Sequence, residues 1–318
     1  MASGPGSAPG RACPVEYRYG ARALRRAPDL EVDALWVAGG LYGNPFALQA
    51  LVERHAAERG PTALVFNGDF HWFDIEEGDF LRIEQGVGQY ASTRGNVETE
   101  LASPSEGAGC GCGYPEWVDE GTVERSNHIL ARLRETAARF PDVLVRLRAL
   151  PMHLVARVGS ERVAIVHGDA DSLAGWAFSQ EALALPGGLA AAERAFDEAD
   201  VRVVASSHTC LPVAQGFPDG RVLANNGAAG MPNFHGERFG VATRIAVSPS
   251  GDALYSLRAG ALHVEAIAVN YDERAWRAKF LEQWPAGSDA HRSYFERIAN
   301  GPRYSRAQAR REAVSLAA

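Results

Sequence analysis

A short apolar run that ends in a glycine and an aspartate constrains the fold of this chain more than any other stretch. Residues 63–66 are Ala-Leu-Val-Phe, and Asn67-Gly68-Asp69 follows them. The run is too short for a helix and too apolar for an exposed strand, which predicts a parallel strand covered on both faces. Ligands of open α/β sheets bind at the carboxyl ends of the strands. We therefore expect Gly68 to turn the backbone there and Asp69 to face a crevice.

The same pattern recurs along the chain. Three further apolar runs and the residues after them are 33–38 before Gly39-Gly40, 162–166 before His167-Gly168-Asp169, and 201–205 before Ser206-Ser207-His208. Three of these four predicted strand ends therefore carry an aspartate or a histidine. Several such side chains at one rim indicate a metal or acid–base site.

Composition excludes several classes of protein. The net charge of −7 argues against a general binder of nucleic acid or anionic membranes. No apolar run approaches the roughly 18 residues that span a bilayer. The first ten residues lack the charged and apolar blocks of a signal peptide, so we expect a disordered tail over residues 1–14. Four cysteines in 318 residues are no disulfide framework, which favours a cytoplasmic location.

The expected elements alternate at first and then become mostly strands. Asn44 and Pro45 are typical of a helix start, which makes residues 33–66 a strand–helix–strand unit with a right-handed connection. The other expected helices are 80–90, 122–140, 190–199, 273–284, 290–298 and 306–315. The other expected strands are a weak edge strand at 15–19, a strand end near 92–98, a hairpin of 153–158 and 162–166, and strands at 212–216, 222–225, 242–247, 254–257 and 263–269.

A run of strands with few helices between them fits an α/β fold with a two-layer β-sandwich and helices on its outer faces. We expect this domain to span residues 15–270 and a helical extension to span residues 271–318. The extension carries Trp, Phe and Tyr at helical intervals. It would either cap the sandwich or pair with a second subunit in a homo-oligomer.

Four polar residues stand just past apolar runs and offer oxygen and nitrogen ligands. They are Asp69, Asn96, His167 and His208. Such a set suits a divalent transition metal, Mn, Fe, Zn or Ni, better than Ca.

Taken in order, these motifs resemble the calcineurin-like metallophosphoesterase family over roughly residues 33–247. The matching segments are Gly68-Asp69, Gly95-Asn96-Val97-Glu98, His167 with Gly168-Asp169, Ser207-His208-Thr209-Cys210, and Asn225-Asn226-Gly227. The resemblance implies a four-layer α/β/β/α fold and metal-dependent hydrolysis of a small phosphoester, nucleotide or phosphoanhydride. It implies that Asp69, Asn96, His167 and His208 are metal ligands.

The chain also departs from the family pattern. Gly40 and Tyr42 stand where the family has the Asp and His of its first metal motif, Cys210 replaces a second His ligand, and Val97 replaces the general-acid His. Two alternatives follow for the metal site. It holds one ion, or it holds two ions with replacement ligands drawn from Cys210, Tyr42, His71, Cys110 and Cys112.

Further residues are candidates for substrate binding and catalysis. The Leu41–Leu48 segment resembles the family's His-Gly-Asn segment, which makes Asn44 a candidate for phosphate binding, and Arg94 could compensate phosphoryl charge. Asn226 begins a glycine-rich turn that could form an anion nest. Glu98 is a replacement acid by proximity alone. A good leaving group is expected, because general acid catalysis is typically worth about 10²–10⁴-fold. The alternative functions are a catalytically silent binding or scaffold module and, less favoured, a redox or metal sensor that uses the cysteines.

Overall fold

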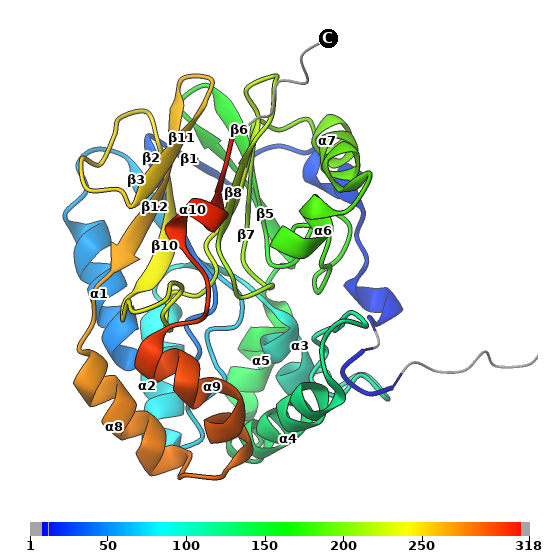
Figure 1. Cartoon of the computed structure of the whole chain (residues 1–318), viewed down its shortest axis with the longest axis vertical. Helices are drawn as coiled ribbons and strands as arrows, with labels where there is room; N and C mark the ends of the chain where they lie inside the picture. The colour runs from blue at the N-terminus through cyan, green and yellow to red at the C-terminus, as the bar shows by residue number, and fades with distance from the viewer. Residues whose placement is uncertain (1–7, 12, 313–318) are drawn as a thin grey trace, which may run out of the picture.

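The computed structural model describes residues 8–11 and 13–312 of the chain, and two mixed β-sheets form its centre (Figure 1). One sheet has the strand order β11-β12-β10-β2-β3-β4, and the other has the order β1-β5-β6-β7-β9-β8-β13. Valine, isoleucine and leucine side chains of both sheets share one buried cluster, among them Val37, Val65, Val163 and Val203. The two sheets therefore pack face to face as a sandwich.

The strands of the first sheet are β2 (Ala34–Ala38), β3 (Thr62–Asn67), β4 (Ala91–Thr93), β10 (Gly240–Ala246), β11 (Tyr255–Ala259) and β12 (Leu262–Val269). The strands of the second sheet are β1 (Leu30–Val32), β5 (His153–Val158), β6 (Glu161–Val166), β7 (Val203–Ser206), β8 (Val213–Gly216), β9 (Val222–Asn225) and β13 (Arg310–Arg311). β2, β3 and β4 run parallel, as do β6, β7 and β9, so within each sheet their carboxyl ends lie at the same edge. Asp69 after β3 and His167 and His208 after β6 and β7 lie close together, so these edges of the two sheets form one rim.

Ten α-helices among the described residues surround the two sheets. They are α1 (Pro45–Ala56), α2 (Glu77–Val87), α3 (Asn96–Ala102), α4 (Glu120–Ala137), α5 (Pro141–Ala149), α6 (Gln180–Ala184), α7 (Gly188–Ala199), α8 (Glu273–Gln283), α9 (Asp289–Asn300) and α10 (Arg306–Ala309). α1 and α2 share a buried cluster with the first sheet, and α6 and α7 share one with the second. The predicted α/β sandwich with flanking helices is confirmed.

The strand–helix–strand unit forms as its sequence indicates. The side chain of Asn44 accepts hydrogen bonds from the amides of Phe46 and Ala47, which caps α1, and Pro45 occupies its first turn. The buried residues of α1 include Leu48 and Leu51, which pack on the first sheet. This helix carries the chain back so that β2 and β3 pair in parallel.

Several predicted elements differ in the structure. Residues 15–17 form a short 3₁₀ turn rather than an edge strand, and Asn96 begins α3. The predicted helix at 122–140 ends at Ala137, and Pro141 starts the separate helix α5 because proline fits a first turn. The predicted helix at 306–315 ends at Ala309, after which β13 pairs with β8, while residues 313–315 lie outside the described part of the chain.

Part of the segment expected to be a disordered tail makes defined contacts. The amide of Gly10 donates to the carbonyl of Ala108 at 2.8 Å, and the guanidinium of Arg11 bonds the carbonyl of Pro115 and the carboxylate of Glu120. Residues 1–7 and 12 of that predicted tail lie outside the described residues. Between residues 8 and 312, no described helix combines the length and the apolar character needed to cross a bilayer.

The C-terminal helices pack onto the sandwich domain. α8 contacts α1, and α9 contacts α4 (Figure 1). Trp276, Phe280 and Trp284 are buried in the same cluster as Phe73, which follows β3. Within this chain the extension therefore caps one side of the core.

Candidate metal centre

Asp69 is held in an unusual conformation at the end of β3. Gly68 and Asp69 both have positive φ, 74° and 50°. The carboxylate of Glu98 accepts hydrogen bonds from the amides of Asp69 and Gly95, both at 2.8 Å, and of Phe70 at 3.0 Å. Because a carboxylate that accepts several amides fixes a tight loop, Glu98 keeps the side chain of Asp69 at the rim of the sheet.

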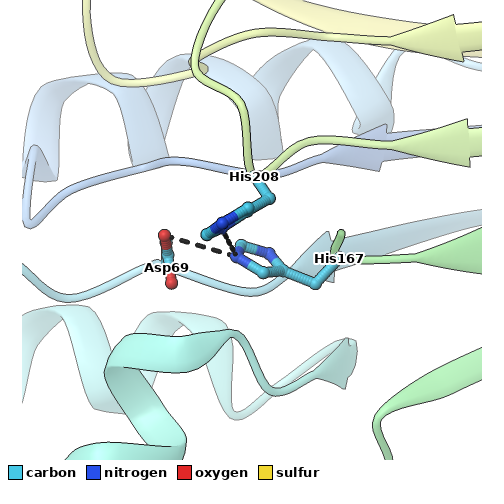
Figure 2. Close-up of side chains that lie close together, drawn as sticks. All are labelled: Asp69, His167 and His208. Atoms are coloured by element: carbon cyan, nitrogen blue, oxygen red, sulfur yellow. Dashed lines mark hydrogen bonds and ion pairs between the residues drawn. The ribbon is translucent and has the colours of Figure 1, made fainter. Parts of the chain in front are cut away.

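Three further side chains meet Asp69 at this rim. His167 follows β6, His208 follows β7, and Asn96 begins α3. The Nε2 atom of His167 lies 3.3 Å from an Asp69 carboxylate oxygen, 3.3 Å from Asn96 Oδ1 and 3.2 Å from Nδ1 of His208. The imidazoles and the carboxylate point toward one another (Figure 2).

The three separations from Nε2 of His167 are those of neighbouring ligands on one transition-metal ion, and the donor atoms of Asp69, His167 and His208 all lie within 4.8 Å of one another. Four ligands at about 2.0–2.1 Å from a tetrahedral ion are about 3.3–3.4 Å apart, which follows from tetrahedral geometry and the usual Zn–N and Zn–O distances. The donor set of one carboxylate, one amide oxygen and two imidazoles matches Mn, Fe, Zn or Ni. All four side chains are buried, with Asp69 5% exposed and Asn96 1% exposed. Asp69, Asn96, His167 and His208 could therefore hold one ion.

Backbone carbonyls orient the donors toward the centre of the cluster. His167 donates from Nδ1 to the carbonyl of Asn67 at 2.8 Å, and His208 donates from Nε2 to the carbonyl of Cys112 at 2.9 Å. Asn96 donates its amide to the carbonyl of Cys110 at 3.0 Å. Since carbonyl oxygens only accept, the lone pairs of the opposite ring nitrogens and of Asn96 Oδ1 face the cluster, as in protein metal sites.

The pKa values in the cluster follow from burial and mutual charge. Burial and the neighbouring His167 lower the pKa of His208 to about 4. Burial alone would raise the pKa of Asp69, but the charge and hydrogen bond of His167 outweigh it and lower this pKa. His208 is therefore neutral and Asp69 ionised near neutral pH, which are the forms that bind a metal. Burial alone would lower the pKa of His167, but the charge of Asp69 outweighs it and raises this pKa, so a bound ion would have to displace a proton from Nε2 of His167.

Two glycines leave the space that the cluster needs. A Cβ atom on Gly68 would contact Nδ1 of His167 and would lie 2.6 Å from the amide nitrogen of Gly95. A Cβ atom on Gly95 would contact the carboxylate of Asp69 and would lie 2.9 Å from the His167 ring. Side chains at these positions would displace the donors.

Two of the predicted replacement ligands lie together beside the donors. The hydroxyl of Tyr42 is 2.9 Å from the sulfur of Cys210, and both residues line the same pocket as Asp69. His71 lies outside the site, because its ring bonds Asp74 at 2.6 Å and Glu84 at 3.3 Å.

The cysteine pair is linked instead of offering thiolates. Cys110 and Cys112 form the single disulfide among the described residues, a local link two positions apart. Their carbonyls orient Asn96 and His208, as described above. The loop that contains the two cysteines therefore helps to position two of the donors.

The residues predicted to bind phosphate have structural partners. Asn44 caps α1 and donates to the carbonyl of Gly230. Asn226 exchanges hydrogen bonds with Gly39 and donates to the carbonyl of Val241. Arg94 donates to the carbonyl of Arg148, outside the cluster. Glu98, the predicted acid, holds the Asp69 loop, so the structure brings none of these four side chains to the donors as a substrate contact.

A pocket of about 230 Å³ opens beside the donors. Asp69, Asn96 and His208 lie on one side of it, and aromatic side chains form much of the rest. Sequence reasoning missed Tyr114, Trp176 and Tyr294, which come from two loops and from α9. No motif or spacing connects these three positions, so only the fold shows that they share a pocket.

Comparisons with known proteins agree with this architecture. Neither a family model nor a curated protein matches the chain. A hypothetical protein from Pyrococcus horikoshii, PH1004, has a similar structure with a TM-score of 0.56 at 17% identity, over 85% of this chain and 99% of that one. A metallophosphoesterase from Sphaerobacter thermophilus has a TM-score of 0.53 at 17% identity, over 85% of this chain and 100% of that one. The fold expected from the sequence is thus confirmed, because the chain shares the fold of a solved metallophosphoesterase.

Proposed function

We propose that this protein is a metal-dependent phosphoesterase that hydrolyses a small phosphoester, nucleotide or phosphoanhydride. The observation that carries the proposal is the convergence of Asp69, Asn96 and His208 on Nε2 of His167 at 3.2–3.3 Å. Nothing in the packing of a sandwich requires four polar side chains to meet in a buried place, where an uncompensated polar group is costly. The fold shared with a metallophosphoesterase supports the same conclusion.

Different residues of this site would bind the metal, position its ligands and accommodate the substrate. Asp69, Asn96, His167 and His208 would hold one divalent ion, which would act as a Lewis acid on the phosphoryl group and lower the pKa of a water molecule. Glu98 fixes the loop of Asp69, and the carbonyls of Cys110 and Cys112 orient Asn96 and His208. The pocket admits the organic part of the substrate. Val97 lines this pocket and has no proton to give, so we expect a leaving group that departs without protonation.

Metal content per chain tests the proposal directly. We expect one ion in the wild type after reconstitution with Mn, Fe, Zn or Ni, and none in His208→Ala. Cys210→Ala should keep the ion, because the sulfur of Cys210 contacts the hydroxyl of Tyr42 and the backbone carbonyl of His208 but none of the four donor atoms. His235→Ala, which changes a histidine away from the cluster, serves as the matched control.

Activity is measured on the same samples with bis(p-nitrophenyl) phosphate, whose leaving group needs no acid. His208→Ala should lower kcat/KM at least about 100-fold, a loss at the upper end of those seen when groups around a metal site are removed. A wild type that binds no ion after reconstitution would refute the proposal. Two ions per chain, one of them lost in Cys210→Ala, would show that the pair of Tyr42 and Cys210 belongs to a second metal site.

A catalytically silent binding module is the second candidate, and Val97 favours it. The resemblance places a general acid at this position, whereas the structure places an aliphatic side chain in the pocket. A silent module would bind the ion and phosphorylated ligands. It would not hydrolyse activated esters, whether it is loaded with Mn, Fe, Zn or Ni. The assay above separates the two candidates.

A further inference from the structure

The pocket beside the donors is lined largely by aromatic side chains, so its preference for a ligand depends on more than the donors. Its walls include Tyr42, Trp72, Tyr114, Trp176 and Tyr294, which come from four loops and from α9. At about 230 Å³ the pocket is smaller than the roughly 300–1,000 Å³ of most ligand sites. It has space for about one flat ring next to the donors.

Three of these aromatic walls have polar tips that the protein occupies, and Nε1 of Trp72 is buried without a hydrogen-bond partner in the described part of the chain. The hydroxyl of Tyr114 lies 3.0 Å from that of Ser126, the indole of Trp176 donates to the carbonyl of Cys112 at 2.9 Å, and Tyr42 pairs with Cys210. The ring of Trp176 also packs edge-on against His208, with centroids 5.4 Å apart. The surfaces left for a ligand are therefore ring faces and edges, which favour an aromatic partner.

Among the described residues that line the pocket there is no arginine or lysine. The nearby arginines are engaged behind the wall. Arg297 donates to the carbonyls of Pro232 and Cys210, and Arg125 donates to the hydroxyls of Ser293 and Thr122. Counted over a divalent ion and its four ligands, the charges sum to one positive charge, because the amide and the imidazoles are neutral ligands. The neighbouring carboxylate of Glu98 is turned to the amides of Asp69, Phe70 and Gly95 instead. One phosphoryl charge balances this sum, and a second charge would have no partner in an apolar pocket.

We propose that the substrate is a singly charged phosphodiester with a flat aromatic group, and that this pocket holds the aromatic group. The inference rests on the proposed phosphoesterase function and names its substrate class. It gives Tyr294 a role in specificity through the ring contact. The same argument disfavours dianionic phosphomonoesters.

Three phosphonate ligands, none of which has an activated leaving group, separate the ring from the charge. Monomethyl phenylphosphonate has one charge and a ring, monomethyl methylphosphonate has one charge and no ring, and phenylphosphonate has a ring and two charges in mildly alkaline buffer. Their affinities for the metal-loaded protein are measured by titration calorimetry. We expect the first to bind at least about tenfold more tightly than the second, the effect of burying a ring of this size. We expect phenylphosphonate to bind no more tightly than its monomethyl ester.

Two neighbouring residues of α9 provide a matched pair of variants. Tyr294 lines the pocket, whereas Phe295 packs against Phe280 and His291. Tyr294→Leu should weaken binding of monomethyl phenylphosphonate about three- to tenfold and leave monomethyl methylphosphonate unchanged, since an aromatic contact is lost. Phe295→Leu should change neither affinity. Tyr294→Phe keeps the ring and should retain the wild-type affinity.

The outcomes distinguish this inference from the proposed function. Equal affinities for the two monomethyl esters, or much tighter binding of phenylphosphonate, would overturn the inference even if bis(p-nitrophenyl) phosphate is hydrolysed. Ring-dependent binding that disappears in Tyr294→Leu supports the aromatic pocket. If that binding occurs in a protein that hydrolyses no ester, the pocket stands and the phosphoesterase function fails.

Discussion

The main chain at Gly95 leaves no room for a side chain beside Asp69, although its φ of −96° suits any residue. Gly95→Ala should therefore act through contact with the donors and not through backbone strain. We expect metal affinity to fall at least about tenfold, as measured by competition with a chromogenic chelator.

Gly78 offers a matched control for this substitution. It lies inside α2 with open space around it, so Gly78→Ala should leave metal affinity unchanged and stabilise the protein by about 0.5–1 kcal/mol. Equal metal affinities of Gly95→Ala and the wild type would show that the donors tolerate displacement.

Replacement of Val97 by a proton donor should add general acid catalysis to the site. Val97 is buried against the pocket at the position where the resemblance expects a general acid. Val97→His should raise kcat for phenyl phosphodiesters, whose leaving group needs a proton, by at least about tenfold, below the usual range of general acid catalysis. Bis(p-nitrophenyl) phosphate should respond little. A Val97→Leu variant controls for the change in shape, and an equal response of both substrates would contradict an acid role.

At the scale of single elements, the start of α3 supports the loop after β3. Glu98 accepts the amides of Asp69, Phe70 and Gly95, and it is fully buried. Glu98→Gln places a donor amide where an acceptor is needed. We expect the free energy of unfolding to fall by about 2–4 kcal/mol, because buried amides lose a charged acceptor. Urea denaturation measures the effect.

Metal affinity should fall together with stability in Glu98→Gln, because the same carboxylate positions Asp69. Glu53→Gln on the exposed side of α1 is the control and should change neither quantity. Unchanged metal binding in a destabilised Glu98→Gln protein would show that Asp69 keeps its place without this support.

The sequence predicted the strands better than the local helix boundaries. β3, β6 and β7 are short and buried, and burial on both faces produces an apolar run that ends abruptly. Because these apolar runs end abruptly, the residues after them, Asp69, His167 and His208, could be identified from the sequence as candidate ligands. The predicted helix over 122–140 runs three residues past the end of α4 at Ala137, and the separate helix α5 that starts at Pro141 was not predicted.

Other site predictions depended on partners that sequence does not reveal. Asn226 and Arg94 are polar residues near predicted turns. Their side chains donate hydrogen bonds to backbone carbonyls elsewhere in the sequence, which the sequence does not reveal. The pocket wall combines α9 with loops more than 100 positions earlier. The spacing of residues along the sequence does not reveal such contacts. Residue chemistry therefore identified the donors, whereas only the fold identified their surroundings.

At the scale of the whole molecule, a buried ion network joins α1 to the first sheet. Arg244 of β10 bonds Glu58, which follows α1, and Glu265 of β12. The hydrogen bond from Arg244 lowers the pKa of Glu58 below 4.5, against the effect of burial. A lowered folded-state pKa stabilises the protein above the unfolded value and loses this contribution as pH falls through the folded value.

Glu58→Gln should consequently cost about 1–3 kcal/mol of unfolding free energy at neutral pH. The difference from the wild type should shrink as the pH falls below 4.5, the ordinary pKa of glutamate. Chemical denaturation at a series of pH values measures both quantities. A difference that is constant across the acidic range would assign the effect to packing rather than charge.

The C-terminal helices contribute to the common core, and their removal tests how far the sandwich depends on them. A chain that ends at residue 271 exposes the surface that Trp276, Phe280 and Trp284 cover. The loss of one such aromatic side chain costs about 3–5 kcal/mol, and whole domains have only about 5–15 kcal/mol. We expect no cooperative thermal transition by near-ultraviolet circular dichroism. A cooperative transition would make the sandwich an independent folding unit.

The place of Tyr294 has a consequence for how this molecule can change over evolutionary time. The donors are encoded between residues 69 and 208, whereas this part of the pocket wall is encoded near residue 294. Mutations around residue 294 can reshape the space next to the donors while every donor stays in place. Descendants of this chain could thus acquire new ligands through changes in α9 alone, with the donor set inherited intact.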